Sequence, residues 1–129
     1  MKRKGHIIPN GVALEKHENK TVVLLTELGF IVELIPPRPQ QPHTKTPDAK
    51  INGKYWEIKS PRKNGKYTIQ HMMQTASKQS INLIIDLRRT TAPVRSLSLI
   101  NHESRLRSKL KNVIVITKEG KIVDIKGSI

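Results

Sequence analysis

Apolar and polar residues alternate along this chain with two different periods, and the changes of period divide it into helices and strands. Three segments have the helical period of about 3.6 residues: 11–28, which ends at a glycine suited to a helix C-cap, 68–80 and 96–111. Six short runs are rich in β-branched, aromatic or other apolar residues: 30–35, 48–52, 55–60, 81–87, 113–117 and 122–125. The predicted order is α-β-β-β-α-β-α-β-β, which indicates a single α/β (α+β) domain.

Two further patterns set the expected boundaries of this domain. Residues 1–10 are expected to form a basic N-terminal arm, and residues 11–129 one folded domain. Residues 36–47 hold five prolines and predict an extended loop, because proline cannot continue a strand ladder. The run 81–87 is almost entirely apolar, so we expect a central strand that is covered on both faces.

The segment 48–59 predicts a β-hairpin that carries opposed acidic residues. Asn52 and Gly53 favour a two-residue turn, since both tolerate a positive φ. That turn would place Asp48 opposite Glu57, about 5 Å apart at Cβ, with Lys59 on the same face. The other face would be mostly apolar and would pack on the core. Because opposed like charges destabilise a sheet, we expect a cation between the two carboxylates.

This arrangement has a chemical interpretation. Asp48 and Glu57 could hold a divalent metal ion, Mg²⁺ being the expected one, which would activate a water and stabilise charge on a phosphoryl oxygen. Lys59 could orient that water or stabilise an anionic transition state. A second interpretation stays open, because a solvent-exposed hairpin with an ordinary Glu–Lys pair has the same spacing.

Charge favours the first interpretation. The 129 residues include 24 Lys and Arg against 10 Asp and Glu, a formal net charge of +14. Such an excess points to nucleic acid, although a basic protein can also bind an acidic protein. Aromatic residues make up only 3%, which favours phosphate-backbone contacts over base stacking. The absence of cysteine excludes disulfides and thiolate zinc sites, and no apolar run reaches the length of a membrane span.

Several polar residues outside the hairpin are candidates for the same site. Glu18 lies on the apolar stripe of the first predicted helix, where an acid is unusual, and Glu15 is the runner-up. Gln79 lies on the buried side of the second predicted helix, where its amide needs a partner. The candidates for phosphate contact follow the hairpin and the central strand: Ser60, Arg62, Lys63, Lys66, Arg88 and Arg89. Each of these residues also has a purely structural interpretation, as a helix-edge acid, a satisfied amide or a solvated turn.

Two family resemblances follow from these motifs. The order α-β-β-β-α-β, with the letters PD at 47–48 and EIK at 57–59, resembles the PD-(D/E)xK nuclease superfamily and its restriction-endonuclease-like core. The segments TPDAKINGKYWEIKSP, 76–89 and 113–124 are similar to the C-terminal nuclease domains of CdiA-type contact-dependent growth inhibition toxins. The superfamily resemblance implies Asp48 and Glu57 as metal ligands and Lys59 as the catalytic lysine. Glu18 would match the acid of the first helix, and Gln79 a glutamine of the second.

The toxin resemblance implies an antibacterial nuclease that cleaves RNA by metal-assisted phosphodiester hydrolysis. The expected substrate is tRNA, with DNA as an alternative. The expected partners are a cognate acidic immunity protein and a host activating factor. The resemblance also implies export as the C-terminal part of a larger toxin protein and action in the cytoplasm of the target cell.

Two other functions remain open on the sequence. Some CdiA-type tRNases have a barnase- or colicin-like fold and cut RNA without metal. That chemistry would fall on His71 or His17, with Arg88, Lys59 and Thr68. A non-enzymatic basic module that binds nucleic acid is the other alternative, although it would gain nothing from carboxylates facing its ligand.

Overall fold

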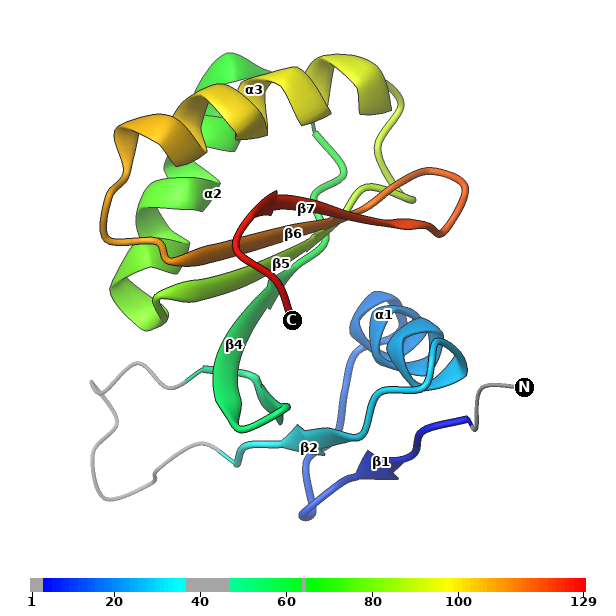
Figure 1. The fold of residues 1–129 in the computed structure, drawn as a ribbon. Helices are drawn as coiled ribbons and strands as arrows, with labels where there is room; N and C mark the ends of the chain where they lie inside the picture. The colour runs from blue at the N-terminus through cyan, green and yellow to red at the C-terminus, as the bar shows by residue number, and fades with distance from the viewer. Residues whose placement is uncertain (1–3, 37–46, 64) are drawn as a thin grey trace.

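A computed structural model describes residues 4–36, 47–63 and 65–129 of the chain (Figure 1). It contains three helices and seven strands in these residues: β1 (Ile7–Ile8), α1 (Lys16–Glu27), β2 (Val32–Leu34), β3 (Ala49–Ile51), β4 (Lys54–Lys59), α2 (Lys66–Gln79), β5 (Asn82–Asp86), α3 (Pro93–Leu106), β6 (Asn112–Ile116) and β7 (Ile122–Lys126). Most of the proline-rich loop predicted at 36–47 lies outside the described residues.

The strands form one sheet in which each strand pairs with the next along the chain, from β1 to β7. The pairs β1–β2, β4–β5 and β5–β6 are parallel, and the others are antiparallel. Figure 1 shows α2 and α3 on one face of the sheet and α1 on the other. The α+β fold class and the α-β-β-β-α-β core predicted from the sequence are therefore confirmed.

The core is divided by the sheet into two clusters, which the alternation of side chains explains. In β5, Ile84 joins the cluster beneath α1, whereas Leu83 and Ile85 join the cluster beneath α2 and α3. All residues of β5 are buried, as the continuous apolar run predicted. On the hairpin, Ala49, Ile51 and Trp56 pack into the α1 cluster, which leaves the acidic face directed away from it.

The hairpin has the predicted turn. Ile51 pairs with Lys54, and the two residues between them have positive φ: 52° at Asn52 and 78° at Gly53. Positive φ at both central residues is the type I′ geometry, whose twist matches that of the flanking strands. This turn fixes the register of β3 against β4, and so decides which side chains share a face.

The N-terminal region differs from the prediction in two ways. Within the expected basic arm 1–10, residues 7–8 form β1, which pairs with β2, and Ile7 packs on the α1 cluster. The first helix begins at Lys16 rather than at residue 11. Glu15 and Glu18 form a capping box there, in which each side chain meets the backbone of the other residue.

The other helix boundaries shift less. The second helix begins at Lys66, two residues before the prediction, and the third runs from Pro93 to Leu106 rather than over 96–111. Pro93 is favourable at the first turn of a helix because that position needs no N–H donor. Leu106, at the end of α3, is exposed. Within the described residues, we find no helix that is long and apolar enough to cross a membrane.

Candidate active site

The hairpin brings its three predicted catalytic residues together. Glu57 is almost fully buried, and its side chain is hydrogen-bonded to that of Asp48 across the hairpin. The Lys59 ammonium lies 3.0 Å from Glu57 Oε2, and the backbone N–H of Ile58 donates to Asp48 Oδ2 over 2.8 Å. The predicted opposition of Asp48, Glu57 and Lys59 is therefore present in the structure.

The electrostatics of Glu57 are unusual. Burial first, and then the hydrogen bond and the negative charge of Asp48, raise the pKa of Glu57 from 4.5 to about 8, although Lys59 opposes the shift. Glu57 Oε1 is buried and has no hydrogen-bond partner among the described residues. One lysine does not balance two ionised carboxylates, so Glu57 holds a proton at neutral pH, and its free oxygen leaves a position for a cation in place of that proton.

A cavity of about 660 Å³ lies next to these residues, where α1, the end of β4 and the start of α2 meet. Its lining includes Glu18, Lys59 and Ser60 of the metal-dependent candidate set. It also includes all three histidine and threonine candidates of the metal-independent set: His17, Thr68 and His71. Asp48 and Glu57 do not line the cavity, but Lys59 contacts both the cavity and Glu57.

The N-terminus of α1 adds a second group of possible ligands to this cavity. Glu18 Oε1 accepts a hydrogen bond from the backbone of Glu15 over 3.0 Å, and His17 Nδ1 lies 3.6 Å from Glu15 Oε2. One ligand atom from each of Glu15, His17 and Glu18 lies within 4.8 Å of the others. The capping box therefore holds Glu18 at the cavity, where the sequence placed it, and ties it to the runner-up, Glu15.

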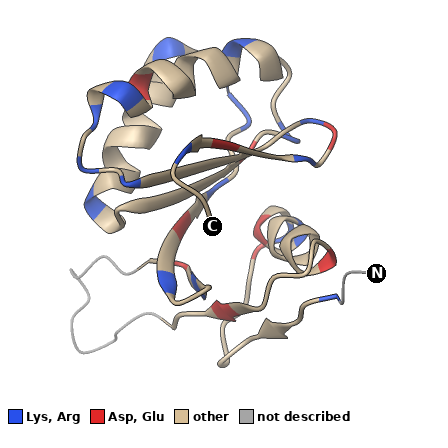
Figure 2. Ribbon diagram, viewed as in Figure 1, with Lys and Arg blue, Asp and Glu red and all other residues tan. Residues whose placement is uncertain are grey.

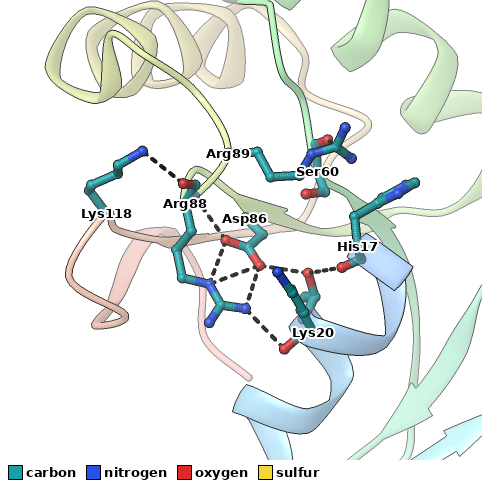
Figure 3. Close-up of polar contacts among 8 residues, drawn as sticks. His17, Lys20, Ser60, Asp86, Arg88, Arg89 and Lys118 are labelled. Carbon is teal, nitrogen blue, oxygen red and sulfur yellow. Dashed lines mark hydrogen bonds and ion pairs between the residues drawn. The ribbon is translucent and has the colours of Figure 1, made fainter. Parts of the chain in front are cut away.

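Arg88 makes structural contacts with Asp86 and with the backbone of α1, and its contact with a substrate stays a prediction. Its Nε and Nη2 donate to the Asp86 carboxylate, at 3.0 Å to Oδ1 and 2.9 Å to Oδ2, and Nη2 also donates to the Lys20 carbonyl on α1 (Figure 3). Arg89, in contrast, makes one hydrogen bond, from Nη1 to the Ser60 carbonyl over 3.3 Å. The two adjacent arginines thus differ: Arg88 joins α1 to the end of β5, and Arg89 extends toward β4.

Asp86 is a residue of this region that sequence reasoning missed. Burial alone would raise its pKa, but hydrogen bonds from the Arg88 guanidinium and the Thr21 hydroxyl outweigh burial and lower the pKa below 3.8. The Thr21 Oγ1–Asp86 Oδ2 distance is 2.6 Å. The available signal was an acid at the end of a largely apolar strand, with two arginines two and three residues further along the chain.

The remaining candidates lie at or outside the edge of the cavity. Arg62 and Lys63 are exposed in the segment between β4 and α2, and Lys66 is exposed at the start of α2. Gln79 is at the opposite end of α2 from the cavity, beside Ser80, whose hydroxyl donates to the Tyr55 carbonyl at the start of β4. Its Oε1 is buried without a partner among the described residues, but Gln79 does not line the cavity.

Comparison with known structures places the fold among bacterial toxin domains. The chain is similar to one in a structure titled "CdiA-CT/CdiI toxin and immunity complex from Burkholderia pseudomallei", with a TM-score of 0.71 and 24% sequence identity. The match covers 95% of this chain and 100% of that chain. No curated protein matches the sequence.

The family follows from the sequence model. The model described as "Contact-dependent growth inhibition CdiA C-terminal domain" matches residues 45–122, which is more than half of the chain. This protein therefore belongs to the CdiA C-terminal domain family and is a toxin domain of antibacterial contact-dependent growth inhibition. The resemblance drawn from the hairpin and the segments 76–89 and 113–124 is confirmed at the level of the family.

Proposed function

We propose that this toxin domain is a nuclease that cleaves RNA, with tRNA as its substrate, by metal-assisted hydrolysis of a phosphodiester bond. The observation that carries the proposal is the pair of the half-buried Asp48 and the buried Glu57, with Lys59 in contact, at the edge of a large cavity. Two adjacent ionised carboxylates beside one cation leave one negative charge uncompensated, which is costly at a buried position. A site that binds a divalent cation has a use for both.

The side chains fit such a cation. Asp48 and Glu57 supply carboxylate oxygens, which Mg²⁺ prefers, and the unpartnered Glu57 Oε1 is a free ligand atom. Bound there, the ion would supply Lewis-acid stabilisation of a phosphoryl oxygen and a lower pKa for a coordinated water. Lys59, at 3.0 Å from Glu57, would contribute an ammonium that stabilises the anionic transition state.

Charge supports nucleic acid as the substrate. Lys and Arg are distributed over α2, α3 and the segment after α3 (Figure 2), and the exposed Arg62 and Lys63 extend the basic surface beside the cavity. A net charge of +14 would bind a phosphate backbone with a strong dependence on salt. The choice of tRNA over DNA rests on the resemblance to toxin tRNases, and DNA is the alternative substrate.

A second mechanism is favoured by one specific observation. His17, Thr68 and His71 line the same cavity as Lys59. These are the groups that a metal-independent ribonuclease would use to activate a 2′-hydroxyl and protonate the leaving oxygen. That mechanism requires RNA and leaves a 2′,3′-cyclic phosphate, whereas metal-assisted hydrolysis does not require the 2′-hydroxyl.

Partners and location follow from the family. The structural neighbour is a toxin–immunity complex, and we infer a cognate immunity protein for this domain, with an acidic surface to complement the charge of +14. We further infer that the domain is exported as part of a larger toxin protein, acts in the cytoplasm of the target cell and uses a host activating factor there.

The test compares nucleic acids and metals with the purified domain. Total tRNA and plasmid DNA are each incubated with the protein in Mg²⁺ and in EDTA, beside a Glu57→Gln variant. Glu103→Gln is the matched control, because Glu103 is also a buried glutamate paired with a cation, Arg107, at 3.0 Å, and lies on α3 outside the cavity lining. We expect Mg²⁺-dependent loss of tRNA that Glu57→Gln abolishes and Glu103→Gln retains.

Other results would support another function. Cleavage of RNA in EDTA by the Glu57→Gln variant would replace the metal mechanism with the histidine mechanism. Loss of plasmid DNA with intact tRNA would change the substrate. Salt-dependent binding without cleavage, with or without a cell extract to supply a host factor, would indicate the non-enzymatic binding module.

A further inference from the structure

A second, smaller cavity of about 210 Å³ lies between α1 and the C-terminal end of β5. It is lined by His17, Lys20, Ser60, Asp86, Arg88 and Arg89. Figure 3 shows Arg89 and His17 on either side of Ser60, with Asp86 and Arg88 below them. Since His17 and Ser60 also line the larger cavity, the two cavities are adjacent.

The charges in the wall of this cavity do not cancel. Among the described residues, Asp86 is the one acid that lines this cavity. Both of its oxygens are already occupied: Oδ1 by the backbone N–H and Nε of Arg88, and Oδ2 by Thr21 Oγ1 and Arg88 Nη2. Arg88 and Asp86 therefore neutralise each other. Lys20 and Arg89 remain as uncompensated positive charges.

Unused hydrogen-bond donors also face this space. Among the residues that the structure describes, the Lys20 ammonium has no hydrogen-bond or ion-pair partner, and Arg89 uses only Nη1, in one 3.3 Å bond. The Ser60 hydroxyl is buried without a partner among the same residues. A buried hydroxyl normally finds a partner, so its position beside the Arg89 side chain (Figure 3) points to an anionic ligand with several acceptor oxygens.

We propose that this cavity is a phosphate-binding subsite, in which Lys20, Arg89 and the Ser60 hydroxyl hold a phosphate group next to the one that is cleaved. The inference rests on the proposed function and adds a specific contact between substrate and enzyme. The volume is below the roughly 300–1,000 Å³ of pockets for drug-sized ligands, and so suits a phosphate group better than a whole nucleotide. Arginine is suited to this role because its planar group donates two parallel hydrogen bonds to phosphate.

The phosphate has two possible sources, an internal phosphodiester or a terminal phosphate. Binding is measured by fluorescence anisotropy on the Glu57→Gln protein, so that cleavage does not contribute. The probes are a short RNA oligonucleotide with a 5′-phosphate and the same oligonucleotide without it. Equal weakening of both probes by a change in the cavity identifies an internal phosphodiester, and weakening of the phosphorylated probe alone identifies a terminal phosphate.

The change in the cavity is Arg89→Gln, and the matched control is Arg105→Gln, which removes the same charge from an exposed position at the end of α3. We expect about a tenfold rise in Kd for Arg89→Gln, as for the loss of a charge-assisted hydrogen bond, and a small, purely salt-dependent change for Arg105→Gln. Lys20→Gln, at an exposed position, is an independent test in case Arg89→Gln folds poorly. We expect Lys20→Gln to raise Kd several-fold.

The proposal would be overturned if Arg105→Gln raised Kd for both probes as much as Arg89→Gln or Lys20→Gln does. Any surface cation would then contribute equally to binding. The outcome is separable from the nuclease proposal. Binding that depends on Arg89 without cleavage by the unmodified protein would retain the phosphate subsite and reject the nuclease. Cleavage by the unmodified protein, with a KM that Arg89→Gln leaves unchanged, would retain the nuclease and reject the phosphate subsite.

Discussion

Asp48 and Glu57 are hydrogen-bonded through their side chains across the hairpin, and this contact, together with burial, raises the pKa of Glu57 to about 8. The metal-free protein at neutral pH therefore holds a proton where we propose a divalent cation. Proton and cation would compete for the same carboxylates, so pH and metal are linked in both stability and activity.

The raised pKa makes a prediction about stability. Between 4.5 and about 8 the folded protein holds a proton on Glu57 that the unfolded chain releases. Stability contributed by this group is therefore complete below pH 4.5 and is lost as the pH rises toward 8. The melting temperature is measured in EDTA by differential scanning fluorimetry. From pH 5 to pH 9, we expect it to fall further for the unmodified protein than for Glu57→Gln.

Comparison with Glu57→Gln is necessary because the other charges of this basic protein titrate as well. Adding Mg²⁺ at pH 9 should restore the melting temperature of the unmodified protein, since the cation replaces the lost proton, and should leave Glu57→Gln unchanged. Parallel pH profiles for the two proteins would show that Glu57 does not titrate in this range.

Lys59 is predicted to affect rate more than binding. Activity is expected to rise with pH as Glu57 loses its proton and can bind the metal ion. Because the Lys59 ammonium lowers the pKa of Glu57, Lys59→Met should raise that pKa further and move this rise in activity to higher pH. Loss of one electrostatic contact in the transition state typically lowers kcat by about 10²–10³-fold. The measurement is kcat and KM against pH on tRNA, with Lys78→Met, an exposed lysine in the last turn of α2, as the control. If Lys78→Met lowered kcat as much as Lys59→Met does, the proposed role of Lys59 in the transition state would be contradicted.

The Asp86–Arg88 pair gives a prediction about the fold. Asp86→Asn would leave the Arg88 guanidinium without its counter-charge and weaken the connection from Lys20 to β5, and breaking a buried pair in this way typically costs about 3 kcal/mol. Because the pKa of Asp86 is lowered in the folded protein, the stabilisation by this pair is present above pH 3.8 and is lost as the pH falls below 3.8. The free energy of unfolding, measured by urea denaturation at pH 7 and pH 3, tests the cost of Asp86→Asn and its dependence on pH. Glu119→Gln, at an exposed position, is the control. A free energy of unfolding unchanged at pH 7 would reject the pair as a structural element.

Sequence patterns were sufficient for the parts of this site that depend on local structure. The Asn52-Gly53 turn has one favoured conformation, so it fixed the register and placed Asp48, Glu57 and Lys59 on one face. The apolar run at 81–87 predicted a central strand, and β5 is buried along its whole length. The start of α1 was predicted too early because apolar residues continue with helical spacing back to Leu14. The capping box of Glu15 and Glu18 instead determines that the helix begins at Lys16.

Long-range contacts were beyond the reach of the sequence. Arg88 and Arg89 are adjacent and chemically identical, yet only one of them is used to bind Asp86, because successive side chains point in different directions at the end of β5. The pairing of β1 with β2 was missed for a similar reason: Ile7 and Ile8 are too short a run to predict a strand, and their partner lies more than twenty residues away.

The docking of β1 can be tested at Gly5. A Cβ at this position would overlap the backbone of Phe30, whereas a Cβ at Gly11, which has a φ of +77°, would meet no atom within 4 Å. Gly11→Ala should cost about 1 kcal/mol from backbone strain alone, and Gly5→Ala should cost more. Hydrogen exchange gives the specific readout: the Val32 N–H, which donates to the His6 carbonyl over 3.0 Å, should lose protection in Gly5→Ala and keep it in Gly11→Ala. Retained protection in both variants would mean that β1 pairs without the close approach at Gly5.

His71 separates the two catalytic mechanisms. It is exposed and lines the large cavity, but it makes no contact with Asp48 or Glu57 among the described residues, so metal-assisted hydrolysis does not need it. We expect His71→Ala to cleave tRNA in Mg²⁺ within a small factor of the unmodified rate, while Glu57→Gln loses activity. A general acid or base contributes about 10²–10⁴-fold, so a loss of this size in His71→Ala, with cleavage that continues in EDTA, would assign the chemistry to the histidines. The ends of the products give an independent answer, because only attack by the 2′-hydroxyl produces a 2′,3′-cyclic phosphate.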